Sequence, residues 1–244
     1  MIFGPSSARG TTPSIPARLS EALLRVIALR ENFDAHPELA LPWKEVKHWQ
    51  SRRLRRTYPD LFAQPRYRVA GEFFLNEIYG ARDFSQRDRE ALRVVPKLAR
   101  MLPERAVETL LLAVELDEMS EQLDARVAGK IVLPVDDRSY AAAYVAAGTP
   151  AERRAQIEHV ERIGRALEKL ARVPLLTGML HLMRAPAEAA GLSHLHHFLQ
   201  RGFDAFKAMG PAGEFLGTIM RRETALMDRL FAGDPAPFRD LAPA

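Results

Sequence analysis

Glu77 is the carboxylate whose neighbours most suggest chemistry. Phe73 and Phe74 precede it by four and three residues, so on a helix both rings share a side with the carboxylate. A carboxylate beside apolar rings is expected to be partly buried, which is costly unless it is paired or protonated. Glu77 is interpreted as a structural ion pair with Arg82, Arg87 or a distant arginine, as a general acid–base or ligand-binding group, or as an exposed side chain.

The aromatic and charged residues around Glu77 form the first candidate site. The site would either hold a small molecule or cofactor or pin the helix to the loop that follows it. Its residues are Phe73, Phe74, Glu77, Tyr79, Asp83, Phe84 and Arg87. The residues do not specify a cofactor, whose identity is unknown at this stage.

A basic segment over residues 43–56 forms the second candidate site, an anion or partner surface. Its cations are Lys44, Lys47, Arg52, Arg53, Arg55 and Arg56, and Trp43, Trp49 and Tyr58 are interleaved with them. Cations neutralise phosphates and aromatic rings stack on bases, so nucleic acid is one interpretation. The charges surround the helix without forming a clean face, which leaves an acidic protein surface, a membrane headgroup or a solvated face as alternatives.

Metal chemistry has little support in the sequence. Glu45 and His48 have the E-x-x-H spacing of di-iron bundles, but it occurs once where such a site needs two. His194, His196 and His197 are interpreted as a histidine-rich first helical turn with too few further ligands. The chain has no cysteine, and no nucleophile elbow, phosphate-binding loop or zincin motif is present. We therefore predict no metal site, and whether the chain is an enzyme stays open.

Composition indicates an ordinary globular protein. Hydrophobic residues make up 47% and charged residues 27% of 244 residues. The absence of cysteine, of a signal peptide and of a transmembrane run favours a cytoplasmic location. Up to residue 100 there are 18 Lys and Arg against 11 Asp and Glu, whereas residues 101–140 hold 4 against 9. We interpret the acidic run 115–124 as the wet side of its helix, although it could also meet the basic helix.

Apolar residues recur at intervals of three and four residues, over segments that Pro and Gly residues bound. This spacing is typical of α-helices. We predict an all-α fold, a single bundle of about ten helices that are largely antiparallel neighbours. The expected domain covers residues 18–232, between a flexible N-terminal tail (1–17) and a C-terminal tail (233–244). The expected helices cover residues 18–33, 42–57, 66–79, 85–101, 103–128, 137–147, 151–172, 175–190, 192–209 and 212–231. In the first of them, Arg30 lies on the stripe that Leu19, Leu23, Val26 and Ile27 form.

The segment from Gly71 to Asp88, read GEFFLNEIYGARDFSQRD, resembles the signature of the bacterial FFLEELY-motif family of uncharacterised proteins. Residues 198–206 and 221–227 are also similar to that family. The sequence departs from the signature at Asn76, where the family has Glu, and at Ile78, where it has Leu. The resemblance implies an all-helical bacterial domain and transfers no activity, substrate or cofactor.

Three functions compete at this stage. The leading hypothesis is a non-catalytic interaction or regulatory module that binds a protein partner or a second copy of the chain. The second is a small-molecule or cofactor-binding bundle, or an enzyme, with its site around Glu77. The third is nucleic-acid binding through the basic helix 43–56.

Overall fold

The computed structural model describes residues 13–78 and 84–240, and this part of the chain is all α-helical with no strand. It contains twelve α-helices, ten of which have seven residues or more. The predicted all-α bundle is therefore confirmed. The helices are α1 (Ile15–Ala35), α2 (Pro37–Thr57), α3 (Pro59–Ala63), α4 (Pro65–Phe73), α5 (Ser85–Met101), α6 (Glu104–Ala128), α7 (Asp137–Ala147), α8 (Pro150–Ala171), α9 (Pro174–Leu182), α10 (Arg184–Ala189), α11 (Ser193–Met209) and α12 (Gly213–Phe231).

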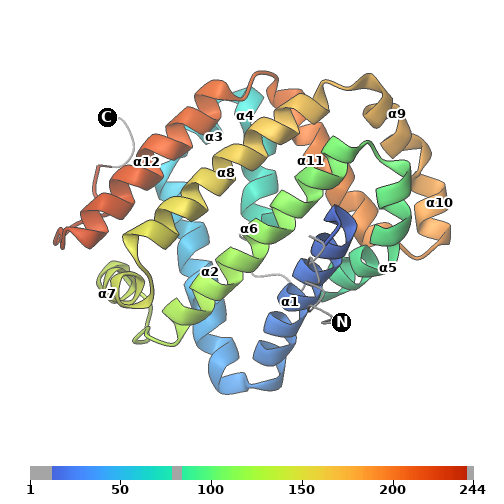
Figure 1. The fold of residues 1–244 in the computed structure, drawn as a ribbon. Helices are drawn as coiled ribbons and strands as arrows, with labels where there is room; N and C mark the ends of the chain where they lie inside the picture. Colours follow the sequence, from blue (N-terminus) through green and yellow to red (C-terminus); the bar gives the residue numbers. More distant parts are fainter. Residues whose placement is uncertain (1–12, 79–83, 241–244) are drawn as a thin grey trace, which may run out of the picture.

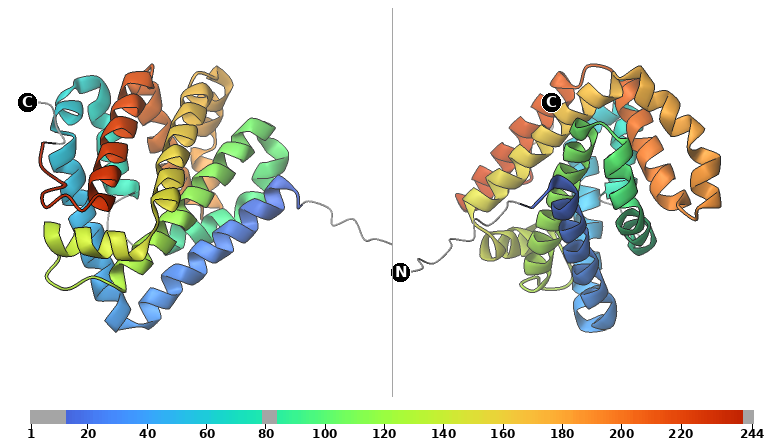
Figure 2. Two further views of the ribbon diagram at one scale, coloured as in Figure 1. Left: turned by 60° about the vertical axis from the view of Figure 1, so that its left-hand side comes forward. Right: turned by 45° about the vertical axis from the view of Figure 1, so that its right-hand side comes forward.

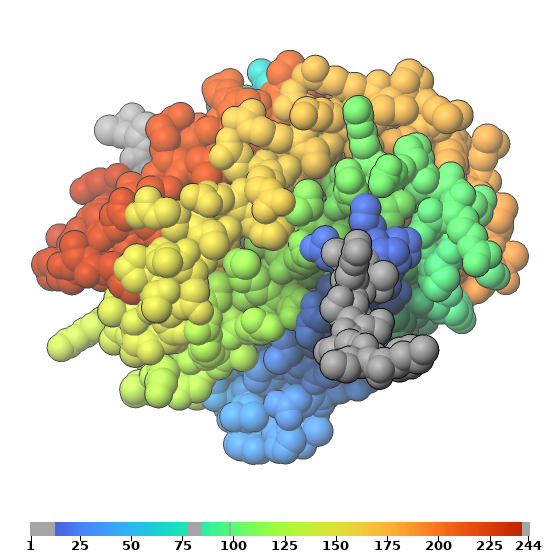
Figure 3. All heavy atoms as spheres, in the orientation of Figure 1, coloured from blue at the N-terminus to red at the C-terminus, as the bar shows by residue number. Residues whose placement is uncertain are grey.

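Helices that are distant in sequence form the most extensive contacts. Helices α6, α8 and α12 lie side by side as three rows (Figure 1), and α1 packs along α6 (Figure 2). Helix α4 packs on α11, and α2 also contacts α6. In the space-filling view, α6, α8 and α12 make up most of one face, and the corner between α1 and α2 forms its lower edge (Figure 3). Helix α6 is therefore covered by α1, α2 and α8.

Several helix boundaries differ from those expected. Helix α2 begins five residues early because Pro37, interpreted as part of a break, occupies its first position, which tolerates proline. Pro42, the expected start, lies inside the helix. Pro59 ends α2 as expected, but it also begins the short helix α3. Residues 175–190 form two helices, α9 and α10, rather than one.

The helix that carries Glu77 changes type before it ends. Helix α4 covers Pro65–Phe73, and the next turn, Phe74–Ile78, is π-helical. A π turn holds more residues than an α turn, so the 3.6-residue period used for the prediction does not apply there. The expected end of this helix at residues 79 and 80 lies outside the described residues.

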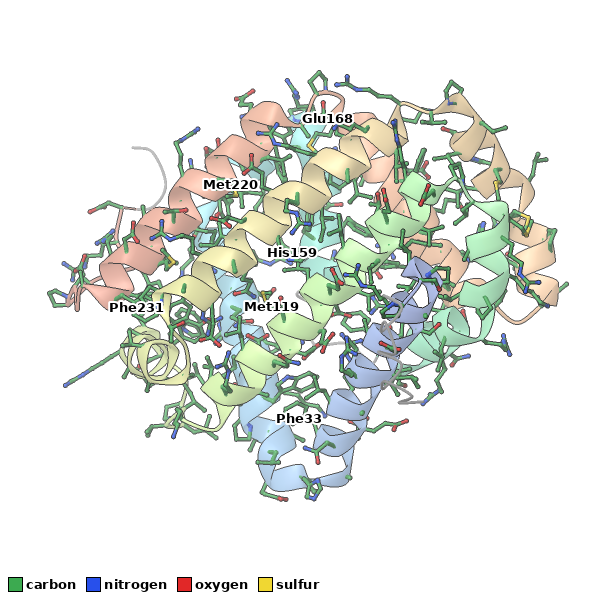
Figure 4. All side chains as sticks on the ribbon, viewed as in Figure 1. Phe33, Met119, His159, Glu168, Met220 and Phe231 are labelled. Atoms are coloured by element: carbon green, nitrogen blue, oxygen red, sulfur yellow. The ribbon has the colours of Figure 1, made fainter. Side chains whose placement is uncertain are left out.

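Three clusters of buried apolar side chains form the core. One joins α3, α4, α11 and α12, a second joins α1, α5 and α6, and a third lies where α2 meets α6 and α7. In the third cluster, Phe33 stacks on Trp43 with ring centroids 4.9 Å apart, and Trp49 stacks on Tyr140 at 3.8 Å. Phe33 lies at the base of the α1–α2 pair (Figure 4). Phe238, within the expected C-terminal tail, packs edge-on against Trp49, with ring centroids 5.0 Å apart.

A glycine sets the close approach of α8 and α12. A Cβ at Gly164 of α8 would lie 2.3 Å from Cδ2 of Leu216 on α12, closer than real Cβ contacts. Both residues are buried. Leu216 therefore occupies the space that any other residue at position 164 would need.

No helix in the described part of the chain is long and apolar enough to cross a membrane.

Candidate functional site

Arg30 of α1 lies buried among carboxylates from α5 and α6. Its Nη2 is 2.8 Å from Oδ1 of Asp117 and 2.8 Å from Oε1 of Glu121, and its Nη1 contacts the carboxylate of Asp88. Burial by itself lowers the pKa of Arg30, but the three carboxylates outweigh burial and raise it. Arg30 therefore stays charged inside the protein.

Glu121 of α6 joins three helices through its two oxygens. Oε1 accepts from Arg30 and, at 2.7 Å, from Nζ of Lys47 on α2, while Oε2 accepts from Nε1 of Trp43 at 3.2 Å. Glu121 is 1% exposed. Burial raises the pKa of Glu121, but Lys47 and Arg30 outweigh burial, so its pKa falls below the usual range. The carboxylate is held ionised by groups of its own fold.

Arg87 and Phe84 extend this cluster to the beginning of α5. The Arg87 guanidinium is 2.9 Å from Oδ1 of Asp88 and lies over the rings of Phe84 and Phe198, 4.4 Å and 4.6 Å from their centroids. Arg30 lies over the same Phe84 ring at 5.3 Å. We call this set the ionic network; its charged members are Arg30, Lys47, Arg87, Asp88, Asp117 and Glu121.

One feature of the sequence indicates this network. Arg30 lies on the apolar stripe of its helix, where a charged side chain needs a buried partner. The partners are 58 to 91 residues away in sequence, and no local spacing connects them. The acidic run was interpreted as a wet helix face, with contact to the basic helix as the alternative. The wet face is wrong for Glu121 and Asp124, whereas the alternative is confirmed for them, because both are buried against α2.

Glu77 is paired with an arginine of α11. Its Oε1 is 2.6 Å from Nη1 of Arg201, and its side chain is 12% exposed. Phe73 packs on Phe198, with ring centroids 5.5 Å apart, and Phe74 packs on core rings of α11 and α12. Arg87 lies over the same Phe198 ring, so Phe198 connects Phe73 with the ionic network, to which Phe84 and Arg87 of the first candidate site belong. The two remaining members of that site, Tyr79 and Asp83, lie outside the described residues.

The structure sorts the cations of α2 into two groups. Lys47 and Arg53 are buried against carboxylates, Glu121 for Lys47 and Glu223 of α12 for Arg53. The exposed cations are Lys44, Arg52, Arg55 and Arg56. The three aromatic residues of the segment are all buried, with Trp43, Trp49 and Tyr58 at most 9% exposed. The rings that were expected to stack on bases are therefore part of the core.

The exposed basic residues form a row along one face of α2. Lys44, His48, Arg52 and Arg55 follow one another at spacings of four, four and three residues. At about 100° per residue, these positions fall within about 80° of the helix circumference. We call them the α2 basic row. Within the described residues, Lys44, Arg52 and Arg55 have no carboxylate within salt-bridge distance, and His48 lies 3.7 Å from Glu45.

A surface groove of about 690 Å³ lies beside this row, between α2 and the start of α7. Trp49 and Val135 line it together with Arg52, Arg56 and Arg138. The two aspartates that also line it are engaged locally. Asp136 accepts from the backbone N–H of Ser139 at 2.7 Å, and Asp137 accepts from Arg56 at 2.8 Å. Arg52 and Arg138 therefore remain available to an anion from outside.

Two of the three clustered histidines have one hydrogen-bond partner each, while Nδ1 of His196 is buried without one in the described part of the chain. Nδ1 of His194 is 2.9 Å from Oε1 of Glu90, and Nε2 of His196 is 2.8 Å from the carbonyl oxygen of Leu180. Among residues 13–78 and 84–240, no three His, Asp or Glu side chains are grouped so as to hold a metal ion.

Asp124 is buried near the ionic network in a different electrostatic setting. Its Oδ1 accepts from Nε2 of Gln50 at 2.7 Å. Burial raises the pKa of Asp124, and the nearby Lys47 only partly offsets it. A folded-state pKa above the unfolded value stabilises the fold at low pH, and this contribution is lost as the pH rises through the folded pKa.

We therefore expect Asp124→Asn to be at least as stable as the parent at pH 7. Any advantage should be smaller at a pH below the folded-state pKa of Asp124, which burial holds above its usual range, because the parent aspartate is then protonated and neutral. Urea unfolding of both proteins at the two pH values measures the difference. A loss of more than about 1 kcal/mol at pH 7 would show that the charge of Asp124 stabilises the fold.

Comparison with known proteins gives one match. A family model described as "Domain of unknown function (DUF8198)" matches residues 29–237. No curated protein and no solved structure matches. The matched range includes both candidate sites and every member of the ionic network, and the resemblance to the FFLEELY-motif family stays a prediction.

Proposed function

We propose that this chain, which belongs to the DUF8198 family, is a non-catalytic interaction module that binds an anionic partner through the exposed face of α2. The observation that carries the proposal is the α2 basic row, whose Lys44, Arg52 and Arg55 have no carboxylate partner in the described part of the chain. By contrast, the exposed Arg18 and Arg25 of α1 are each 2.6 Å from a glutamate of α6. A row of uncompensated cations attracts an anionic surface and guides its approach.

The buried charges support a structural role for the interior. Glu121 binds Arg30, Lys47 and Trp43, so both of its oxygens are used within the fold. Glu77 is paired with Arg201, and the rings of Phe73 and Phe74 pack into the core. These contacts favour the interaction module over the alternative of a ligand-binding or catalytic site around Glu77.

Reversing the charges of the α2 basic row, by replacing its lysine and arginines with glutamate, tests the proposal. We expect the parent protein to bind immobilised heparin, used as a polyanion probe, and the variant Lys44→Glu/Arg52→Glu/Arg55→Glu to elute at markedly lower salt. The control variant Arg162→Glu/Lys169→Glu/Lys207→Glu has the same change in net charge at exposed positions on α8 and α11. Because binding to a defined row depends on position, this control should elute near the parent.

Equal shifts for the two triple variants would mean that heparin senses only net charge, and the proposal would fail. Circular dichroism of each variant confirms that it is folded, which is expected because all six positions are exposed.

A further inference from the structure

The exposed face of α2 carries an apolar residue as well as cations. Leu41, 55% exposed, precedes Lys44 by three residues and continues the basic row by one position. The combined positions 41, 44, 48, 52 and 55 have spacings of three, four, four and three. With a rise of about 1.5 Å per residue, they extend over about 21 Å. This pattern of threes and fours is the one that a second helix matches when it lies alongside.

The groove between α2 and the start of α7, at the edge of the exposed α2 face, has room for one anionic side chain of a partner. Arg52 belongs to both the row and the groove, and Arg138 approaches from the start of α7. Both arginines are exposed and neither forms a salt bridge within the described residues, although Asp136 of the same groove attracts Arg138 electrostatically. A carboxylate placed between two guanidinium groups forms strong charge-assisted hydrogen bonds.

Two observations favour a protein helix over nucleic acid. The surface offers little ring area to a base, because Trp43 and Tyr58 are buried and Trp49, which lines the groove, is only 3% exposed. It also mixes its cations with the exposed Leu41 and with Glu45, whose side chain is 40% exposed. A phosphate backbone is uniformly negative and has no group to match a leucine or a glutamate, whereas a helix can present a different side chain at each turn.

We infer that the partner is an acidic α-helix of another protein, which lies along α2. Its carboxylates bind Lys44, Arg52 and Arg55, an apolar side chain packs on Leu41, and one further carboxylate enters the groove between Arg52 and Arg138. The inference rests on the proposed function, since it names the chemical class of the anion that the α2 basic row binds.

Labelled peptides test the inference with the intact chain. The probe is a designed helical peptide of about 20 residues, with a leucine followed by glutamates at spacings that match Leu41 and the row. The matched control peptide has glutamine at every glutamate position. We expect the acidic peptide to bind at least about tenfold more tightly in fluorescence anisotropy. Arg52→Glu and Arg138→Glu should each weaken it by a similar factor, and Lys97→Glu should not.

Nucleic acid provides the competing outcome. Duplex and single-stranded DNA with the label of the peptide are titrated under the same salt conditions. If DNA binds through the row and the acidic peptide does not, the helix inference is overturned while the proposed function stands. If reversing the charges of the α2 basic row weakens the binding of neither the peptide nor the DNA, both the helix inference and the proposed function fail. If Arg138→Glu leaves peptide affinity unchanged while Arg52→Glu abolishes it, the assignment of a carboxylate to the groove is wrong.

Discussion

Glu121→Gln is expected to destabilise the protein by about 3–5 kcal/mol. It leaves Lys47 buried without its salt-bridge partner and removes one of the three carboxylates around Arg30. Glutamine keeps the size of the side chain, so the loss reports charge rather than a cavity. Arg30 and Lys47 are 6% and 7% exposed and cannot move into water without opening the α1–α2 packing. Urea unfolding of the parent and the variant at neutral pH measures the difference in the free energy of unfolding. The m-values of the two proteins are compared to confirm that the same transition is measured.

Glu118→Gln is the matched control for this prediction. Glu118 lies on the same helix, 2.6 Å from Nε of Arg25, but the Arg25 side chain is 53% exposed. A partly solvated pair of this kind contributes about 0–1 kcal/mol. Equal losses for the two variants would show that Glu121 stabilises no more than a surface charge does. The lowered pKa of Glu121 gives a second check, since its contribution should be complete above the unfolded pKa and disappear as the pH falls through the folded one.

Gly164→Ala is expected to destabilise the protein by about 1–3 kcal/mol through overpacking between α8 and α12. The added methyl carbon would lie 2.3 Å and 2.9 Å from the two Cδ atoms of Leu216, which is itself 2% exposed. The usual preference of helices for alanine, about 1 kcal/mol, acts in the opposite direction and is too small to prevent the loss. Thermal and urea unfolding give the net effect.

Two further variants isolate this cause. Gly178 of α9 has no atom within 4 Å of an added Cβ, so Gly178→Ala should be neutral or stabilising by up to about 1 kcal/mol. Leu216→Ala removes the obstacle, and the double variant Gly164→Ala/Leu216→Ala should lose less stability than the sum of the single losses. Additive losses would show that the two side chains do not compete for space.

The helices could be predicted because the information for them is local. Apolar spacing and the positions of Pro and Gly identified the segments that became α5, α6, α7, α8, α11 and α12, with small errors at their ends. The early start of α2 and the helix α3 were missed because a proline that ends one helix also fits the first position of the next. The π turn at Phe74–Ile78 was missed because a single turn is too short to show a repeating spacing of apolar residues in the sequence.

The candidate sites depended on information that is not local. The sequence placed six cations and two tryptophans on α2 without showing which of them point inwards. Their direction depends on where α6 and α12 carry Glu121 and Glu223. Contact between the acidic run and the basic helix was one of two expectations, and Lys47 and Glu121 form it. The pairing of Arg30, on the apolar stripe of α1, with Asp117 and Glu121 of the acidic run was not foreseen. Pairing them required knowing that α1 packs on α6.

The link from Glu121 to Arg30 and Lys47 also constrains the order of events during synthesis. A ribosome has made 74 residues beyond Lys47 before it adds the glutamate that neutralises it, and 91 beyond Arg30. Until then the nascent α1–α2 segment carries two cations whose native environment does not exist, and it exposes the apolar faces on either side of them. We therefore expect α1 and α2 to complete their native packing only after α6 has been synthesised.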